Sequence, residues 1–311
     1  MSWLSKFRIL KPEIKDPPDL AVLKISSYEG YECHSDEHKT QNSGNISFEN
    51  RLIPNPRANF KVEGYCYVCK THTKFLVDFQ YSYQLNNVSM PNWRERLICP
   101  SCNLINRHRA TVHLFEKECR PRTDSKIYMT EQITPLYSLL KKRYPETCGS
   151  EYIGDKVSYG SCNANGIRNE DFTNLSFDND EFDHILSFDV LEHILQYQKA
   201  LLECLRCLKH GGMLFFSVPF NKNSEKNIVC ARVHEDGNIE HILPPEYHGD
   251  PMSSAGVLCY NSFGWELLDE IRVIGFVDVH ALFYWSKELG YLGGEQVQFK
   301  ATKGCPTPSP D

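Results

Sequence analysis

Hydrophobic and polar positions divide this chain into two parts with different patterns. After residue 125, short apolar runs alternate with amphipathic stretches. The apolar run over 182–189 is followed by a helical pattern over 196–209 and then by a nearly continuous apolar run over 213–220. Continuous apolar runs are typical of strands buried on both faces of a parallel sheet. The alternation predicts an α/β fold with a doubly wound, mostly parallel sheet.

The part before residue 125 lacks this alternation. Its first 60 residues are rich in Pro, Ser and Asn and show no sustained periodicity, which predicts an extension that drapes over the rest or is partly mobile. A cysteine-punctuated unit follows, with strand-type residues over 74–83 and a helical stretch over 105–117. The predicted organisation is an extension, a small cysteine module and an α/β domain, over 1–60, 61–123 and 124–311.

Four cysteines of this unit form two C-x-x-C pairs, Cys66 with Cys69 and Cys99 with Cys102. A C-x-x-C turn directs two thiolates to one point, and two such turns supply the four sulfurs of a tetrahedral structural Zn²⁺ site. The alternatives are two fortuitous pairs in a cysteine-rich chain, or a redox dithiol. The spacing favours a four-cysteine zinc module.

Composition and charge narrow the function classes. The 311 residues include 13 cysteines and carry a net charge of −6, and no apolar run approaches the ~20 residues that span a membrane. An odd number of irregularly spaced cysteines points to a reducing compartment, so we expect a cytoplasmic protein. The net charge argues against nucleic acid as a partner. Arg107 and Arg109, with Arg94 nearby, form either a phosphate-contacting patch or a domain-docking face, and interleaved glutamates favour docking.

Two segments carry a family resemblance. One is D-F-T-N-L-S-F, the F-D-H-I-L-S-F-D strand and D-V-L-E-H-I, over 171–194, and the other is L-K-H-G-G-M-L-F-F-S-V-P over 208–219. Their order resembles that of class I S-adenosylmethionine-dependent methyltransferases with a type 11-like domain, and the cysteine module resembles the N-terminal zinc ribbon of some bacterial methyltransferases. The resemblance implies a Rossmann-like, seven-stranded methyltransferase sheet and S-adenosyl-L-methionine as cofactor.

Acidic residues at strand ends fit such a cofactor. Glu151 lies 20 residues after Glu131, close to the spacing of a nucleoside-binding βαβ unit. By resemblance, Glu131 faces the methionine end, Glu151 binds the ribose, and Asp171 and Phe172 contact the adenine. Asp189 lines the methyl-transfer pocket by the same resemblance.

The sequence departs from the family in one loop. The glycine-rich segment after the first strand is replaced by E-Q-I-T-P-L, over 131–136, which contains no glycine. Glycines at such a place let the backbone approach a cofactor closely. The loop is therefore either remodelled around a working site, which the other motifs favour, or part of a degenerate domain.

A long polar segment over 240–251 follows the strand that ends near Pro219, where class I methyltransferases place substrate-binding elements. His248 beside Asp250, with His241 nearby, is the candidate general base, and the alternative is a rigid proline-braced loop. We expect a methyltransferase (EC 2.1.1.-) acting on a hydroxyl or similar nucleophile of a small-molecule or glycan-like acceptor. The alternatives are an RNA methyltransferase that docks substrate through the zinc module, and an inactive scaffold. Neither the methyl acceptor nor the oligomeric state follows from the sequence.

Overall fold

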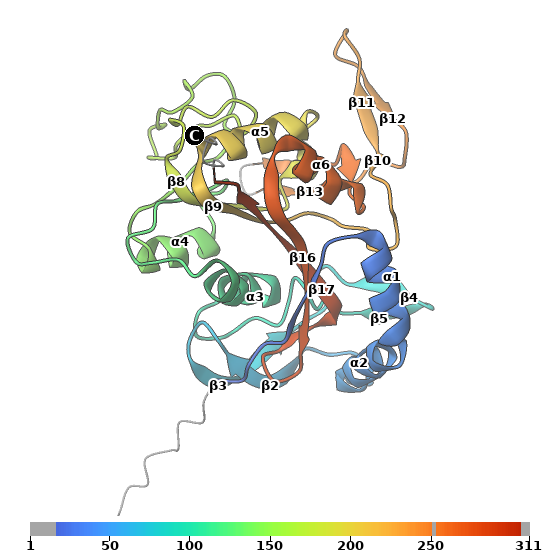
Figure 1. Ribbon diagram of the computed structural model, residues 1–311. Coiled ribbons are helices and arrows are strands. Elements are labelled where there is room, and N and C mark those ends of the chain that lie inside the picture. The colour runs from blue at the N-terminus through green and yellow to red at the C-terminus, as the bar shows by residue number, and fades with distance from the viewer. Residues whose placement is uncertain (1–16, 251–252, 306–311) are drawn as a thin grey trace, which may run out of the picture.

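A seven-stranded sheet forms the centre of the protein, in a computed structural model that describes residues 17–250 and 253–305 (Figure 1). Its strands, in spatial order, are β1 (Val22–Ile25), β16 (Phe276–Ser286), β17 (Tyr291–Lys303), β9 (Leu208–Ser217), β8 (Phe182–Phe188), β6 (Ile127–Met129) and β7 (Thr147–Gly149). Strands β9, β8, β6 and β7 pair in parallel, whereas β17 runs antiparallel to both of its neighbours. The predicted seven-stranded, doubly wound sheet is confirmed, but it is mixed, because β1, β16 and β17 add three antiparallel pairings to the three parallel ones.

Helices cover both faces of this sheet. They are α3 (Asn106–Leu114), which continues as a π-turn over Phe115–Cys119, with α4 (Pro135–Arg143) on one face, and α5 (Tyr197–Cys207) with α6 (Glu266–Ile274) on the other. Side chains of β9 alternate between two buried clusters: Phe215 packs towards α3, while Leu214 and Phe216 pack towards α5 and α6. Burial of both faces explains the nearly continuous apolar run in the sequence.

The N-terminal extension is more ordered than the sequence predicted. Besides β1 at the sheet edge, it forms helices α1 (Tyr28–Glu37) and α2 (Lys39–Leu52). Tyr31 is buried against the rings of Trp265 and Phe283, and the buried carboxylate of Glu49 accepts hydrogen bonds from the indole of Trp285 and from two backbone N–H groups of β17. The sequence predicted an extension that drapes over the rest or is partly mobile, and its described residues pack on the sheet. The helices were not visible in the sequence pattern, because a few specific contacts fix them and not a continuous apolar stripe. Residues 1–16 lie outside the described part.

The cysteine module packs directly on the sheet. It consists of the hairpin β2 (Phe60–Cys66) with β3 (Thr71–Val77), the short hairpin β4 (Tyr83–Leu85) with β5 (Val88–Met90), and α3. From α3 the fully buried guanidinium of Arg109 donates hydrogen bonds to the carbonyls of Leu97, Leu289 and Gly290. One charged group thus links the module to the turn before β17. The predicted domain boundaries remain a prediction.

The segment between β9 and α6 forms three small two-stranded sheets. They are β10 (Ile228–Val229) with β15 (Asn261–Ser262), β11 (Ala231–Val233) with β12 (Ile239–His241), and β13 (Tyr247–Asp250) with β14 (Ser253–Leu258). The β11–β12 hairpin projects away from the body, whereas β13 lies close to the carboxyl end of β8 (Figure 1). Within the described residues, no helix is long and apolar enough to cross a membrane.

Candidate functional site

A cavity of about 1460 Å³ opens at the carboxyl ends of the parallel strands. Its floor is formed by residues that follow β6, β7, β8 and β9, which is where open α/β sheets bind ligands. The cysteine module and the β13–β14 hairpin supply its walls. The lining residues used below are Arg94, Arg107, Glu131, Glu151, Asp171, Phe172, Asp189, His193 and His248.

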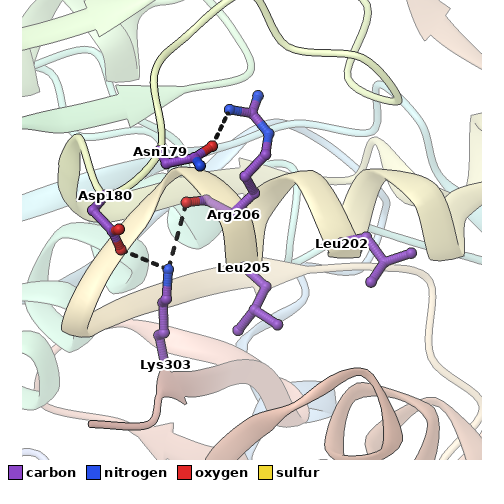
Figure 2. A pocket seen from close by; sticks show the side chains of 6 residues that line it. All are labelled: Asn179, Asp180, Leu202, Leu205, Arg206 and Lys303. Atoms are coloured by element: carbon purple, nitrogen blue, oxygen red, sulfur yellow. Dashed lines mark hydrogen bonds and ion pairs between the residues drawn. The ribbon is translucent and has the colours of Figure 1, made fainter. Parts of the chain in front are cut away.

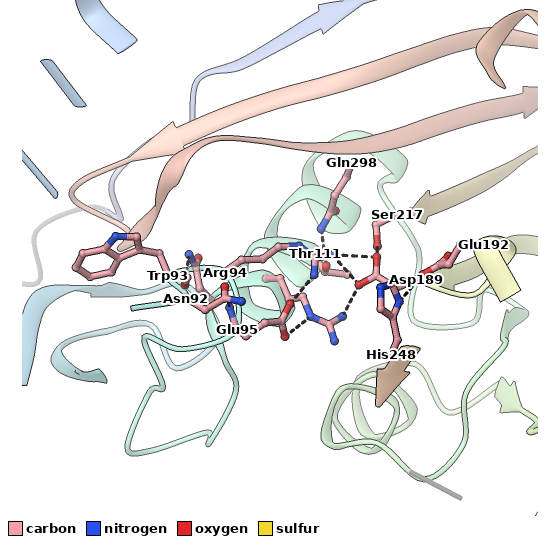
Figure 3. Close-up of polar contacts among 12 residues, drawn as sticks. Asn92, Trp93, Arg94, Glu95, Thr111, Asp189, Glu192, Ser217, His248 and Gln298 are labelled. Carbon is pink, nitrogen blue, oxygen red and sulfur yellow. Dashed lines mark hydrogen bonds and ion pairs between the residues drawn. The ribbon is translucent and has the colours of Figure 1, made fainter. Parts of the chain in front are cut away.

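Asp189, directly after β8, is the meeting point of the sheet and the cysteine module (Figure 3). Arg94 donates two hydrogen bonds to its carboxylate, at 2.9 and 2.7 Å, and Ser217 donates a third at 2.8 Å. Arg107 lies 3.4 Å from Oδ2. Burial alone would favour the neutral acid, but the two arginines hold the pKa of Asp189 well below its usual range. Asp189 therefore contributes a paired negative charge to the cavity.

Glu131, just after β6, brings to the cavity a carboxylate oxygen without a hydrogen-bond partner among the described residues. This oxygen, Oε1, is buried. Burial raises the pKa of Glu131 to about 7, although Arg107 opposes this shift. An orphaned acceptor of this kind is costly unless a ligand supplies a donor or a positive charge.

Glu151 holds the loop that lacks glycine. Its Oε1 accepts hydrogen bonds from the backbone N–H groups of Gln132, at 2.7 Å, and Ile133, at 3.1 Å. The close approach between this loop and β7 depends on Gly149, where a Cβ would lie 2.4 Å from the carbonyl oxygen of Glu131. A glycine on the neighbouring strand thus allows the glycine-free loop to pack closely against β7.

Asp171 and Phe172 lie together at the cavity edge. Oδ1 of Asp171 accepts hydrogen bonds from the backbone N–H and the hydroxyl of Thr173, at 2.8 and 2.7 Å, so the carboxylate also shapes its own turn. The Phe172 ring is 8% exposed and offers an apolar surface against which a flat ring can stack.

Of the two candidate acceptor-side histidines, only one lines the cavity. His248, on β13, lines the cavity, with Nδ1 3.3 Å from Oε1 of Glu192 and Nε2 3.4 Å from Oε1 of Glu246. His241 lies exposed on the β11–β12 hairpin and does not line the cavity. The backbone of Asp250 pairs with Ser253, but its side chain lies outside what the structure describes. Hydrogen bonding to Cys259 and Glu192 raises the pKa of His248 to about 10.

Several residues that line or adjoin the cavity were not recognised from the sequence. Arg94 and Arg107 were assigned to a docking face. Their contact with Asp189, which lies 95 positions from Arg94 in the chain, was not predicted. Glu192, fully buried beside His248, was read only as part of the D-V-L-E-H-I motif. That motif was the one available signal, because it places an acid and a histidine directly after a strand end.

The four cysteines of the two C-x-x-C pairs converge. Their sulfurs lie within 4.8 Å of one another, with Cys66 3.9 Å from Cys102 and Cys69 3.8 Å from Cys99. Metal–sulfur bonds of about 2.3 Å in a tetrahedron place the sulfurs about 3.8 Å apart. The arrangement is compatible with a structural zinc site.

A second, smaller hollow of about 330 Å³ lies between α5 and the end of β17 (Figure 2). Its polar groups already have partners: Lys303 donates to Asp180 at 2.7 Å, and Arg206 donates to Asn179 at 3.0 Å. With these groups satisfied, the hollow offers no obvious ligand chemistry.

Comparison with known families finds a methyltransferase domain within the chain. Residues 139–216 match the family described as a methyltransferase domain. This match, over about a quarter of the chain, confirms the resemblance to methyltransferase domains seen in the sequence. A search of curated proteins found no match.

Three of the solved structures that match this chain are covered over most of their own length. A chain of the Haloferax volcanii complex of the Trm112 methyltransferase activator is 13% identical, with 64% of this chain and 92% of that one covered and a TM-score of 0.40. An S-adenosylmethionine-dependent methyltransferase from Mesorhizobium loti is 13% identical, with 61% and 97% covered and a TM-score of 0.36. The 1,6-didemethyltoxoflavin-N1-methyltransferase of Burkholderia thailandensis is 12% identical, with 64% and 78% covered and a TM-score of 0.36.

The raised pKa of Glu131 makes stability depend on pH. The folded state holds this proton up to about pH 7, whereas the unfolded chain releases it near the ordinary value of 4.5. Stability should therefore fall by up to about 3 kcal/mol as the pH rises from 4.5 to 7. Glu131→Gln should match wild type in urea denaturation at pH 4.5 and exceed it at pH 8. Equal differences at both pH values would show that Glu131 ionises normally.

Proposed function

We propose that this protein transfers a methyl group from S-adenosylmethionine to a hydroxyl or similar nucleophile of a small-molecule or sugar-like acceptor. The observation that carries the proposal is the orphaned Oε1 of Glu131 at the carboxyl end of β6, in the cavity that a methyltransferase domain would use. A bound cofactor would supply the electrophilic methyl group.

The cavity residues fit the two ends of this cofactor. Glu131 offers an acceptor to the amino group of the methionine portion, and binding of a cation there would favour its ionised form. Phe172 offers a flat apolar surface to the adenine, beside the carboxylate of Asp171. Glu151 remains the residue proposed to bind the ribose, and its carboxylate also accepts a hydrogen bond from the loop after β6.

The acceptor side is assigned to the wall that carries His248. Methyl transfer is mainly a positioning problem, but a hydroxyl acceptor must also lose a proton. Of the two candidate histidines, His248 lines the cavity and lies beside the carboxylate of Glu192, while His241 does not. We therefore place the acceptor oxygen near His248. Because the pKa of this imidazole is raised to about 10, only its neutral fraction can accept the proton, and turnover should rise with pH up to about that value.

The arginines of the cysteine module argue against RNA as the substrate. Arg94 contacts Asp189 and Glu95, and Arg107 contacts the same two carboxylates. A phosphate backbone needs basic groups that are free to exchange their counterions. Both arginine side chains are already engaged in ion pairs within the protein, which favours a small acceptor over RNA.

Cofactor binding is tested by thermal unfolding. S-adenosylhomocysteine should raise the melting temperature of wild type, because a ligand that binds only the folded state stabilises it by about 2.7 kcal/mol at 100 times its Kd. Glu131→Gln should weaken binding by about tenfold or more, since it removes a charge-assisted hydrogen bond. The matched control Glu146→Gln, on an exposed turn, should keep the full shift. No shift at millimolar ligand would favour the inactive scaffold.

Loss of His248 should affect turnover and leave cofactor binding intact. With an acceptor found by screening hydroxyl-bearing metabolites, His248→Ala should lower kcat by ~10²-fold or more, the usual scale for losing the group that removes a proton. Its S-adenosylhomocysteine affinity should stay near that of wild type. The control His234→Ala changes an exposed histidine of the same insert and should keep wild-type turnover. Unchanged kcat in His248→Ala would place the acceptor elsewhere.

We also propose that the four cysteines bind structural zinc. Cys66→Ser or Cys102→Ser should each remove one zinc equivalent per chain, measured by elemental analysis of purified protein. Both should lower the melting temperature strongly, because structural zinc contributes on the order of 10 kcal/mol to folding. The control Cys33→Ser changes an exposed cysteine of α1. Retention of all zinc in a stable Cys66→Ser protein would contradict the assignment.

A further inference from the structure

A second group of metal-ligand side chains lies at the acceptor end of the cavity. One ligand atom each from His193, His248 and Cys259 lies within 4.8 Å of the others. The three come from different elements: the short 3-10 turn Leu191–His193 after β8, strand β13, and the residue following β14. Cys259 is 4% exposed, and both histidines line the cavity.

The hydrogen bonds of His193 leave one ring nitrogen available. Its Nδ1 lies 2.9 Å from the carbonyl oxygen of Leu258, and only a protonated nitrogen can bond to a carbonyl. In the neutral ring, Nε2 therefore carries the free electron pair. Histidines that bind metals commonly donate their other N–H to a backbone carbonyl in this way, which fixes the ring and its tautomer.

A buried carboxylate lies beside these residues. Glu192 is fully buried, and its Oε1 faces both imidazoles. Its Oε1 lies 3.3 Å from Nδ1 of His248 and 3.6 Å from Nε2 of His193. Taking a carboxylate out of water is costly unless a positive charge compensates it.

We propose that His193, His248 and Cys259 bind a divalent transition metal of the Zn²⁺ type, with Glu192 compensating its charge from the second layer. Two imidazoles and a thiolate are ligands that zinc prefers over hard cations such as Mg²⁺. With a Zn²⁺ ion and one thiolate the centre has a net charge of +1, which the Glu192 carboxylate neutralises.

The proposed centre differs in kind from the four-cysteine site. Three protein ligands leave one tetrahedral position for a water or a ligand oxygen, which is typical of catalytic zinc. Because His193 and His248 line the cavity, that position belongs to the acceptor side. A hydroxyl acceptor bound there would be more acidic than in water, so the metal would take over the task otherwise assigned to a free imidazole of His248. Only this last role depends on the proposed function.

Zinc counting separates the two centres. Purified wild type, dialysed against micromolar zinc and then against metal-free buffer, should hold one zinc equivalent more than Cys259→Ala and one more than His248→Ala. The controls Cys162→Ala and His234→Ala change exposed residues outside the cluster and should keep the wild-type count. Combining Cys66→Ser with Cys259→Ala should lower the count by two equivalents.

Misfolding does not explain a loss of zinc in His248→Ala, because the side chain of His248 is 29% exposed and its removal opens no cavity in the core. If Cys259→Ala and His248→Ala both retain the wild-type zinc count, the second centre does not exist. S-adenosylhomocysteine-induced shifts in melting temperature, measured on the same proteins, distinguish this failure from failure of the methyltransferase assignment. If the two variants lose zinc but S-adenosylhomocysteine does not shift the melting temperature of wild type, only the proposed function is overturned.

Discussion

The partly buried ion pair between Asp189 and the two arginines of the cysteine module is the interaction on which the site depends. Asp189 stands directly after β8 with a left-handed backbone conformation, φ +54°, which few residues other than glycine adopt readily. The two hydrogen bonds from Nη2 of Arg94 and the hydrogen bond from Ser217 compensate for that strain. Without the arginines, a desolvated carboxylate would remain uncompensated at the centre of the cavity.

This ion pair makes the cysteine module part of the active cavity. Arg94 follows the β4–β5 hairpin and Arg107 lies in the first turn of α3, so both side chains reach Asp189 only if the module is folded and seated on the sheet. Arg109, two residues further along α3, secures that seat through three buried carbonyl contacts. A metal bound by the four cysteines would therefore act on the cavity indirectly, by holding the wall that carries Arg94 and Arg107.

Local patterns predicted the sheet and the acids at its strand ends. The runs that became β8 and β9 are apolar because both faces of the sheet are covered, and Glu131 and Asp189 were identifiable because they directly follow such strands. The convergence of Cys66, Cys69, Cys99 and Cys102 was likewise predictable, since two C-x-x-C turns have few other uses at that spacing.

Contacts between residues far apart in the chain could not be predicted from the sequence. Nothing near Arg94 indicates that its partner is Asp189, and the contacts of Tyr31 and Glu49 that fix the N-terminal helices join positions more than 230 residues apart. The same holds for the meeting of His193, His248 and Cys259, because β13 and β14 return to the end of β8 only through tertiary packing. Such groups are visible only when the whole chain has been placed.

The most direct test of the account is a crystal structure of the protein with S-adenosylhomocysteine. The account predicts the amino group of the ligand at Glu131, its adenine against Phe172, and the ion pair between Asp189 and Arg94 intact beside the sulfur. A ligand bound outside this cavity, or a cavity in which Arg94 has left Asp189 to contact the ligand, would contradict it.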